Sequence, residues 1–251
     1  MSKIIIGSAR HDENGKYVGG KAGDQTGTEV STQEYYLHKK GWFVYRCVSE
    51  IMRQKLAEAM LRACLNNNIG YAQDTRYTLE QYGTDSKYPC NTDCSELIRV
   101  CVKEACGVDL GAGTTTENIG DRLVKTKLFV KMGKVGVQIK AEDLFTGDIL
   151  CTCTKGHVVA IVEGKKDGKE KVDGTAIPAS KPNLKFGSRG TEVKKLQTLL
   201  NNCNNAGLVV DGIFGKNTRV ALVTFQKNHD LVPDGIYGGA TAGRFREILN
   251  V

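Results

Sequence analysis

The sequence predicts an α+β domain, in which a helix packs on an antiparallel sheet, followed by a small domain of three helices. Three observations support this fold class. Helical and strand-like segments occur in blocks rather than in βαβ alternation, a linker-like stretch divides the chain, and a repeated unit follows it. The chain has 251 residues, 40% hydrophobic and 25% charged, which suits a mid-sized plus a small domain and excludes disordered, collagen-like and coiled-coil classes.

Periodic patterns in the first part of the chain predict one long helix and three strands. Ser49 is expected to cap a helix that runs to about Asn66, because apolar side chains recur there at core spacing. Strands are expected at Trp42–Cys47, Ile149–Cys151 and His157–Glu163, which are rich in β-branched or aromatic residues and are bounded by glycines.

Residues 7–28 are glycine-rich and polar, and they predict an ordered loop. Asp24 and Gln25 of this segment are candidates to border a cleft, although a plain loop is the simpler interpretation. The segment contains no phosphate-binding loop motif.

A linker is predicted at residues 175–183, where Pro178, Pro182 and several small residues interrupt the periodicity. The linker divides the chain into a first domain, residues 1–174, and a second domain, residues 184–251.

The second domain contains an internal repeat. Asp211-Gly-Ile-Phe-Gly-Lys-Asn-Thr recurs as Asp234-Gly-Ile-Tyr-Gly-Gly-Ala-Thr. Each copy combines an Asp-Gly turn, an apolar pair and a threonine able to cap the next helix. Three helices are therefore expected, at Thr191–Cys203, Thr218–Asn228 and Thr241–Leu249.

The charge of the chain favours anionic partners. The formal net charge is +7, and residues 184–251 hold nine Lys/Arg against five Asp/Glu, which is 9 − 5 = +4. A basic surface attracts nucleic acid, acidic lipid or an anionic bacterial wall, and charge alone does not choose among them.

No apolar run approaches the roughly 18 residues that span a bilayer. The N-terminal residues lack the apolar core of a secretory signal, so we expect synthesis in the cytoplasm without a signal peptide. The nine cysteines are odd in number and scattered, and we expect reduced thiols rather than a disulfide framework.

The most informative segment begins at Asn91, with the sequence Asn-Thr-Asp-Cys-Ser-Glu-Leu-Ile-Arg. Asp93 is a plausible helix cap, and an apolar stripe follows it, so Cys94 is expected in the first turn of a buried helix. The unpaired N–H groups at a helix start lower a thiol pKa from its usual value near 8.5, and they can receive an oxyanion. Cys94 is therefore the candidate nucleophile.

A nucleophilic cysteine needs a base, and His157 is the best placed of four histidines because it opens an apolar strand. A strand-borne histidine facing a helix-borne cysteine is the papain-like arrangement. Asp173 is the candidate to orient the imidazole, if residues 157–163 and 170–173 form a hairpin. Glu163 is the alternative.

A second interpretation of the thiols is a zinc site. Their spacings differ from the common Cys-x-x-Cys knuckles, so we expect no metal and no other cofactor. The candidate ligands are Cys90, Cys94, Cys151, Cys153 and His157.

The Asp-Cys-Ser-x-Leu-x-Arg motif, Gly147-Asp148 and Gly156-His157-Val resemble the NlpC-type cell-wall cysteine peptidases, with some likeness to CHAP amidohydrolase/peptidases. In NlpC-type enzymes a tyrosine upstream of the cysteine contacts substrate. Tyr71 is the nearest match, and Tyr82 competes for the role. Asp93 and Ser95, on either side of Cys94, are further candidates to bind substrate.

The second domain resembles the three-helix peptidoglycan-binding module over nearly its whole length. The resemblance rests on three segments, Leu184-Lys-Phe-Gly-Ser-Arg-Gly-Thr-Glu-Val-Lys-Lys-Leu-Gln, Val210-Asp-Gly-Ile-Phe-Gly and Pro233-Asp-Gly-Ile-Tyr-Gly. Together the two resemblances make the chain similar to phage or prophage endolysins, which are released to the wall through a membrane lesion.

The family activity implied is cleavage of the γ-D-glutamyl–diamino acid bond of the peptidoglycan stem peptide by Cys94, with His157 as acid–base catalyst. Two alternatives remain: an N-acetylmuramoyl-L-alanine amidase on the same scaffold, and a non-catalytic wall-binding protein. We expect a monomer that acts on bacterial peptidoglycan, without nucleic acid and without stable membrane insertion.

Overall fold

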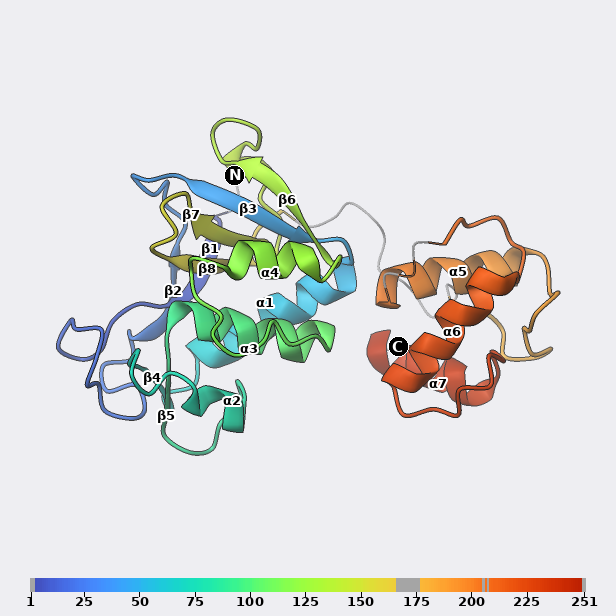
Figure 1. Ribbon diagram of the computed structural model, residues 1–251, viewed down its shortest axis with the longest axis horizontal. Helices are drawn as coiled ribbons and strands as arrows, with labels where there is room; N and C mark the ends of the chain where they lie inside the picture. Colours follow the sequence, from blue (N-terminus) through green and yellow to red (C-terminus); the bar gives the residue numbers. More distant parts are fainter. Residues whose placement is uncertain (1–2, 166–176, 205, 207, 250–251) are drawn as a thin grey trace. The chain divides into compact units, whose positions relative to one another are not determined.

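The computed structural model of the protein describes residues 3–165, 177–204, 206 and 208–249. Two compact units, Met1–Asp167 and Gly168–Val251, make up the chain (Figure 1).

The first unit is built on a six-stranded sheet in which all neighbouring strands are antiparallel (Figure 1). In spatial order the strands are β2 (Val30–Glu34), β1 (Ile5–Ala9), β8 (Val158–Glu163), β7 (Ile149–Thr152), β3 (Trp42–Cys47) and β6 (Phe129–Lys134). The three predicted strands are confirmed, and they are adjacent as β8, β7 and β3. The α+β class with an antiparallel sheet is confirmed as well.

One expectation about the N-terminal region is wrong. The segment at residues 7–28 does not begin as a loop, because Gly7 lies within β1 between β2 and β8. Gly7 permits close packing there, since a Cβ at this position would lie 2.6 Å from Cγ of Met60. The irregular part of the segment begins at Arg10.

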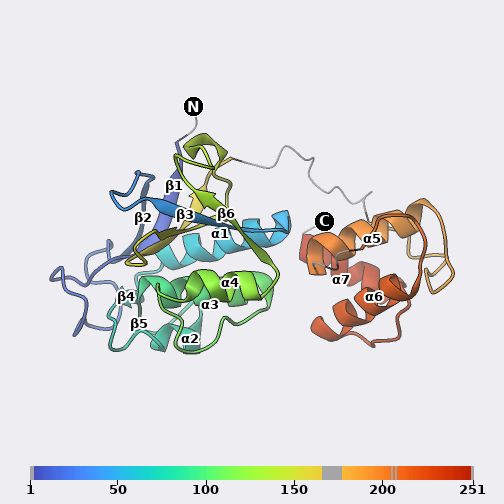
Figure 2. The same cartoon turned by 45° about the horizontal axis from the view of Figure 1, so that its top comes forward.

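The helices of this unit lie on one side of the sheet, as both Figure 1 and Figure 2 show. The helices and remaining elements of this unit are α1 (Glu50–Cys64), α2 (Thr78–Tyr82), α3 (Cys94–Cys106), α4 (Ile119–Lys125), the 3-10 turn η1 (Ala141–Asp143) and the short parallel pair β4 (Ile69–Tyr71) and β5 (Cys90–Thr92). Both α1 and α3 contact β8 and each other.

The bounds of the first helix, α1, follow from residues near its two ends. Oγ of Ser49 accepts the backbone N–H of Met52 at 3.3 Å, which confirms the predicted cap. The helix ends at Cys64, close to the expected end, and it buries Leu56 and Met60 completely.

The two faces of the sheet hold different apolar clusters. Val158 and Ala160 of β8 belong to the cluster on the side of the helices. Val159 and Ile161 belong to a second cluster, which includes Trp42 of β3. This alternation follows from the two-residue period of a strand, and it decides how the candidate site is arranged.

The described residues of the second unit form three helices, as predicted: α5 (Thr191–Asn204), α6 (Lys216–Asn228) and α7 (Gly239–Leu249). Their shared core includes Phe225 and Phe245, whose stacked rings have centroids 4.1 Å apart.

The expected linker lies partly outside the described residues, since 175 and 176 are not among them. The part that is described makes hydrogen bonds to α5 and to the residue Tyr237 just before α7. The hydroxyl of Tyr237 donates to the carbonyl of Pro178 at 2.8 Å, and the backbone N–H of Ala179 donates to Glu192 at 2.6 Å.

Within the described residues, no helix combines the length and the apolar character that crossing a bilayer requires.

Candidate functional site

The candidate nucleophile lies where the sequence predicts it, in the first turn of α3. Asp93 is the N-cap, and its Oδ1 accepts the backbone N–H of Glu96 at 2.7 Å. The helix then buries its apolar stripe against α1 and β8. Cys94 is thereby held at the junction of α3 with the sheet.

The acidity expected for this thiol is wrong. The surroundings raise the pKa of Cys94 to about 12, first through burial and then through the negative charge of Asp93. The backbone N–H groups of Val158 and Ser95 act in the opposite direction, and they do not overcome the burial. Cys94 is therefore a neutral thiol in the resting protein.

The candidate base, His157, directly precedes Val158 in the chain, but its ring lies on the opposite side of the sheet from Cys94. Val158 faces Cys94, whereas the ring of His157 lies beside Trp42, with centroids 6.3 Å apart. Trp42 belongs to the cluster on the face away from the helices. Within the described part of the chain, no hydrogen bond joins Sγ of Cys94 to the imidazole of His157.

A second histidine lies near the first. The ring of His38 lies 5.2 Å from that of Trp42. Burial, with the positive charges of Arg10 and His38, lowers the pKa of His157 to about 4. The imidazole of His157 is therefore neutral at pH 7 and able to accept a proton.

The structure narrows the choice of a third catalytic residue. Asp173 lies outside the described residues. Glu163 is at the opposite end of β8 from His157 and pairs with Ile5, so six residues at about 3.3 Å each separate it from the imidazole. Glu163 therefore cannot orient the ring of His157, and that alternative is wrong.

Of the two candidate tyrosines, Tyr71 lies beside Cys94. Burial, and next the neighbouring Cys94 thiol, raise the pKa of Tyr71. Its hydroxyl accepts Nε2 of Gln73 at 3.1 Å, and its backbone N–H donates to the buried carboxylate of Glu29 at 2.9 Å. Tyr71 is itself only 2% exposed.

Tyr82 makes different contacts from Tyr71. It is 44% exposed on α2, and its ring packs against Tyr88 with centroids 5.3 Å apart. Sequence alone did not separate the two tyrosines, because both stand upstream of Cys94 at plausible spacings.

Asp93 and Ser95 are joined through an arginine that the sequence analysis missed. Nη1 of Arg76 contacts Oδ2 of Asp93 at 2.5 Å and Oγ of Ser95 at 3.3 Å, and Ser95 donates to Oδ1 of Asp93 at 2.8 Å. Arg76 stands in the irregular stretch between β4 and α2, where no periodic pattern marks it.

A second missed residue is Tyr17. Its ring is 60% exposed and meets that of Tyr71 edge-on, with centroids 6.2 Å apart. The carbonyl of Tyr17 accepts the backbone N–H of Gln73 at 2.8 Å, which ties the N-terminal loop to this place. Tyr17 is thus an accessible aromatic ring next to the buried neighbour of Cys94.

Asp24 and Gln25 stabilise their own loop. Oδ1 of Asp24 accepts the backbone N–H of Gly27 at 2.7 Å, and Nε2 of Gln25 donates to the carbonyl of Gly23 at 2.8 Å. These contacts fit the simpler interpretation of the two residues.

None of the nine cysteines forms a disulfide. In the part of the chain that the structure describes, no three His, Cys, Asp or Glu side chains are grouped so that they could hold a metal ion.

The fold and the site define an α+β domain with a helix-borne cysteine, joined in one chain to a three-helix unit with an internal repeat. Residues 6–168 match the endolysin-like domain, and residues 189–244 match a peptidoglycan binding domain. The first match covers more than half of the chain, so the protein belongs to the endolysin-like domain family. The two matches together support an endolysin architecture, with peptidoglycan as the partner and a role in binding and hydrolysing the bacterial cell wall.

Proposed function

We propose that the protein cleaves the stem peptide of peptidoglycan, with Cys94 as the nucleophile and His157 as the acid–base catalyst. One observation carries this proposal: in an endolysin-like domain, a cysteine stands in the first turn of a helix that packs on an antiparallel sheet, with its sulfur facing the backbone N–H of Val158. This arrangement supports a papain-like relation to the NlpC-type peptidases.

The chemistry begins from a neutral thiol and a neutral imidazole. The imidazole removes the proton from Sγ of Cys94 as the sulfur attacks the carbonyl carbon, and the backbone N–H groups of the first turn of α3 stabilise the oxyanion. The C–N bond then breaks, the leaving amine takes the proton from the imidazolium, and water hydrolyses the thioester. The thiol and the imidazole therefore do not need to form a thiolate–imidazolium ion pair before the attack.

This mechanism needs His157 to turn. Its ring lies beside Trp42 in the free protein, yet its backbone directly precedes Val158, which faces Cys94. Because successive side chains along a strand point to opposite faces, the backbone before Val158 must shift together with the side chain for the imidazole to reach the sulfur. Catalytic hydrogen bonds often form only once substrate is bound. The role of Asp173 in orienting the ring remains a prediction from the sequence, because Asp173 lies outside the described residues.

The proposed substrate site has a buried floor and an open rim. Tyr71, Asp93 and Ser95 are at most 5% exposed, so they shape the floor. Tyr17 is the exposed ring beside them and is the side chain we expect to contact the substrate. From the resemblance to NlpC-type enzymes, the bond cleaved is that between γ-D-glutamate and the diamino acid.

A specific observation favours a second candidate function. The high pKa of Cys94 and the lack of a hydrogen bond to His157 suit a structural cysteine in a protein that only binds the wall. The two functions differ in whether lysis of walls depends on this thiol.

The experiment is a turbidity assay on purified wall suspensions. Cys94→Ala is expected to abolish lysis, whereas Cys153→Ala, which removes a partly buried thiol elsewhere, is expected to retain it. Unchanged lysis by Cys94→Ala would contradict the proposal. No lysis by the wild-type chain would favour the wall-binding alternative.

A further inference from the structure

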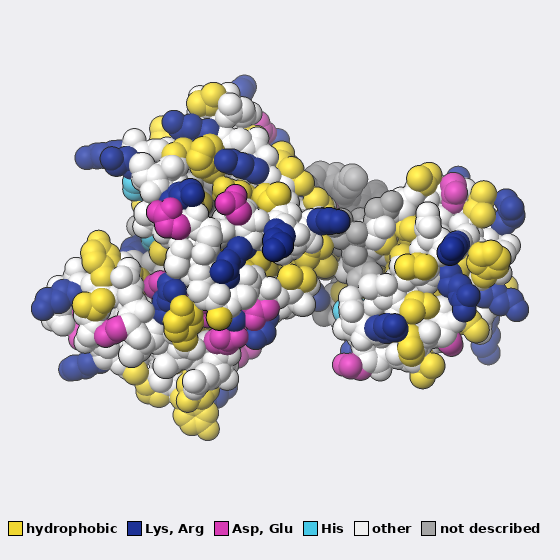
Figure 3. Space-filling model, viewed as in Figure 1, with side chains coloured by type: hydrophobic (Ala, Val, Ile, Leu, Met, Phe, Trp, Pro, Cys, Tyr) yellow, Lys and Arg dark blue, Asp and Glu magenta, His cyan; other side chains and the backbone are white. Residues whose placement is uncertain are grey.

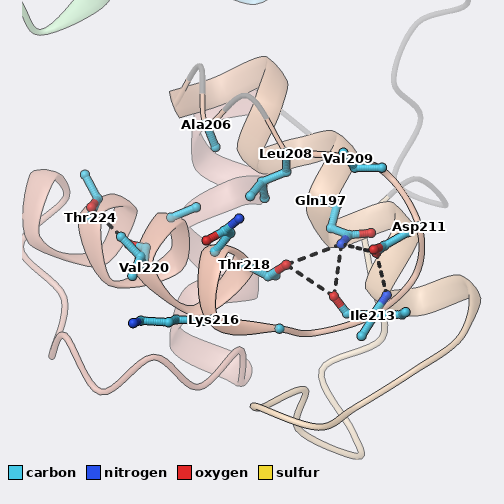
Figure 4. A pocket seen from close by; sticks show the side chains of 13 residues that line it. Gln197, Ala206, Leu208, Val209, Asp211, Ile213, Lys216, Thr218, Val220 and Thr224 are labelled. Atoms are coloured by element: carbon cyan, nitrogen blue, oxygen red, sulfur yellow. Dashed lines mark hydrogen bonds between the residues drawn. The ribbon is translucent and has the colours of Figure 1, made fainter.

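The second unit contains two copies of one hydrogen-bond network. In the first copy, Nε2 of Gln197 donates to Asp211 (Oδ1, 2.8 Å), Ile213 (carbonyl, 3.1 Å) and Thr218 (Oγ1, 3.3 Å) (Figure 4). Its Oε1 accepts the backbone N–H of Gly212 at 2.8 Å. One buried amide thus joins α5, the Asp-Gly turn and the start of α6.

The second copy repeats each contact. Nε2 of Gln226 donates to Asp234 (2.9 Å), the carbonyl of Ile236 (3.1 Å) and Thr241 (3.3 Å), and its Oε1 accepts the N–H of Gly235 at 2.9 Å. The scaffold is therefore the same in both copies, and any difference between them lies in the side chains around it.

A groove lies beside the first network, between α6 and the connection that joins α5 to α6, with a cavity volume of about 710 Å³ (Figure 4). Leu208, Val209 and Val220 supply apolar lining, and Asp211 and Lys216 are its charged residues. Within the described residues Lys216 takes part in no ion pair, so its ammonium group is available to a ligand.

The second copy lacks this combination of an unpaired lysine and small neighbouring side chains. When the repeats are aligned on Asp211 and Asp234, Gly239 stands where the first copy has Lys216. Arg244 and Glu247 stand at the positions of Ala221 and Thr224, and these two form an ion pair of 2.8 Å with each other. An unpaired lysine beside small side chains is thus a property of the first copy.

We infer that the groove between α6 and the α5–α6 connection binds the peptide stem of peptidoglycan, with Lys216 pairing with a stem carboxylate. The stem carries carboxylates, a diamino acid and alanine methyl groups. These match the ammonium of Lys216, the carboxylate of Asp211 and the apolar lining. N-acetylated sugars carry no charge and would use neither charged group.

This inference deepens the wall-binding part of the proposed function and does not depend on Cys94. The basic character of the unit is consistent with it: Lys and Arg side chains are prominent on the face of the three-helix unit that Figure 3 shows. The first copy then recognises the wall, while the second copy keeps the scaffold.

The test is co-sedimentation of the full chain with purified sacculi in the cold, in the Cys94→Ala background. Lys216→Glu is expected to weaken binding about 10-fold or more, because a charge-assisted contact becomes a repulsion. Lys227→Glu is the matched control, since it makes the same charge change on an exposed part of α6 outside the groove. It is expected to change binding less than about 2-fold.

A second variant tests the groove without removing the lysine. Ala221→Arg with Thr224→Glu introduces the ion pair of the second copy and is expected to weaken binding as Lys216→Glu does. Thermal unfolding of each variant shows whether the unit stays folded.

Competition identifies the ligand. The tetrapeptide L-Ala-γ-D-Glu-L-Lys-D-Ala is expected to displace the protein from sacculi, and an N-acetylglucosamine oligomer is not. Equal binding by Lys216→Glu and Lys227→Glu would overturn the inference, as would displacement by the oligomer alone. Loss of the Lys216 effect on walls stripped of teichoic acid would also overturn it, because the anion would then be that polymer. If the Cys94→Ala protein still digests walls, the hydrolytic mechanism fails while this comparison stands.

Discussion

The two faces of strand β8 hold the two halves of the proposed chemistry. On the face covered by helices, Val158 packs beside Cys94. On the other face, Val159 packs with Trp42, and His157 lies against the same indole ring. The thiol and the imidazole are therefore close along the chain and separated by the sheet, because one step along a strand turns a side chain to the opposite face.

Under the proposed mechanism, this separation means that the free protein is not yet arranged for catalysis. Both groups are neutral, since burial raises the pKa of Cys94 to about 12 and lowers that of His157 to about 4. The proposed mechanism therefore requires the imidazole to reach the helix face when substrate binds.

The largest expected effect comes from removing the imidazole. His157→Ala should reduce the rate of wall lysis about 10²- to 10⁴-fold, as loss of a general acid–base catalyst does. His38→Ala removes the other histidine beside Trp42 and should leave lysis nearly unchanged. The turbidity assay compares the lysis rates of the two variants. An equal loss of rate in both would contradict a specific catalytic role for His157.

The next effect uses two adjacent valines on opposite faces. Val158→Ala and Val159→Ala each remove two methyl groups from a fully buried site, so each should lower the free energy of unfolding by about 1–3 kcal/mol. Denaturant unfolding measures this loss. Only Val158→Ala opens space at Cys94, so only that variant should speed alkylation of this thiol by iodoacetamide. Equal alkylation in both variants would mean that the two faces are not separated as described.

A smaller effect concerns the acidity of the thiol. Asp93→Asn keeps a side chain that can cap α3 but removes the negative charge that helps to raise the pKa of Cys94. The pKa should therefore fall, and the pH profile of Cys94 alkylation should move to lower pH. An unchanged profile would show that burial alone sets this pKa.

The last effect concerns how the stability of the fold depends on pH. The pKa of His157 falls from 6.5 to about 4 on folding, so below pH 6.5 the unfolded chain binds a proton that the folded chain does not. The free energy of unfolding is therefore unaffected by the titration of His157 above pH 6.5, and it decreases as the pH falls from 6.5 toward 4. His157→Gln should flatten that decrease in thermal unfolding, and His11→Gln, on the exposed N-terminal loop, should not.

Local signals predicted much of this fold. The caps Ser49 and Asp93, the strand Trp42–Cys47 and the helices of the second unit follow from patterns within a few residues of each element. The repeat at Asp211 and Asp234 also predicted that two copies of one structure would form.

The parts that sequence patterns did not predict depend on contacts between distant segments. The place of β1 between β2 and β8 needs pairing between opposite ends of the first unit, from Gly7 to Ala160. The pKa of Cys94 is set by what buries it, and the contact of Arg76 with Asp93 joins irregular backbone to a helix cap. The face on which His157 lies follows from strand register, which its apolar neighbours leave open.

The most direct test of the proposed mechanism is end-group mass spectrometry of purified peptidoglycan after digestion by the wild-type chain. Catalysis by Cys94 should produce new free amino groups on the diamino acid of the stem peptide, and none when Cys94→Ala replaces the wild type. New amino groups on L-alanine would point to amidase activity instead. Products that form equally with Cys94→Ala would contradict the central claim that this thiol carries the reaction.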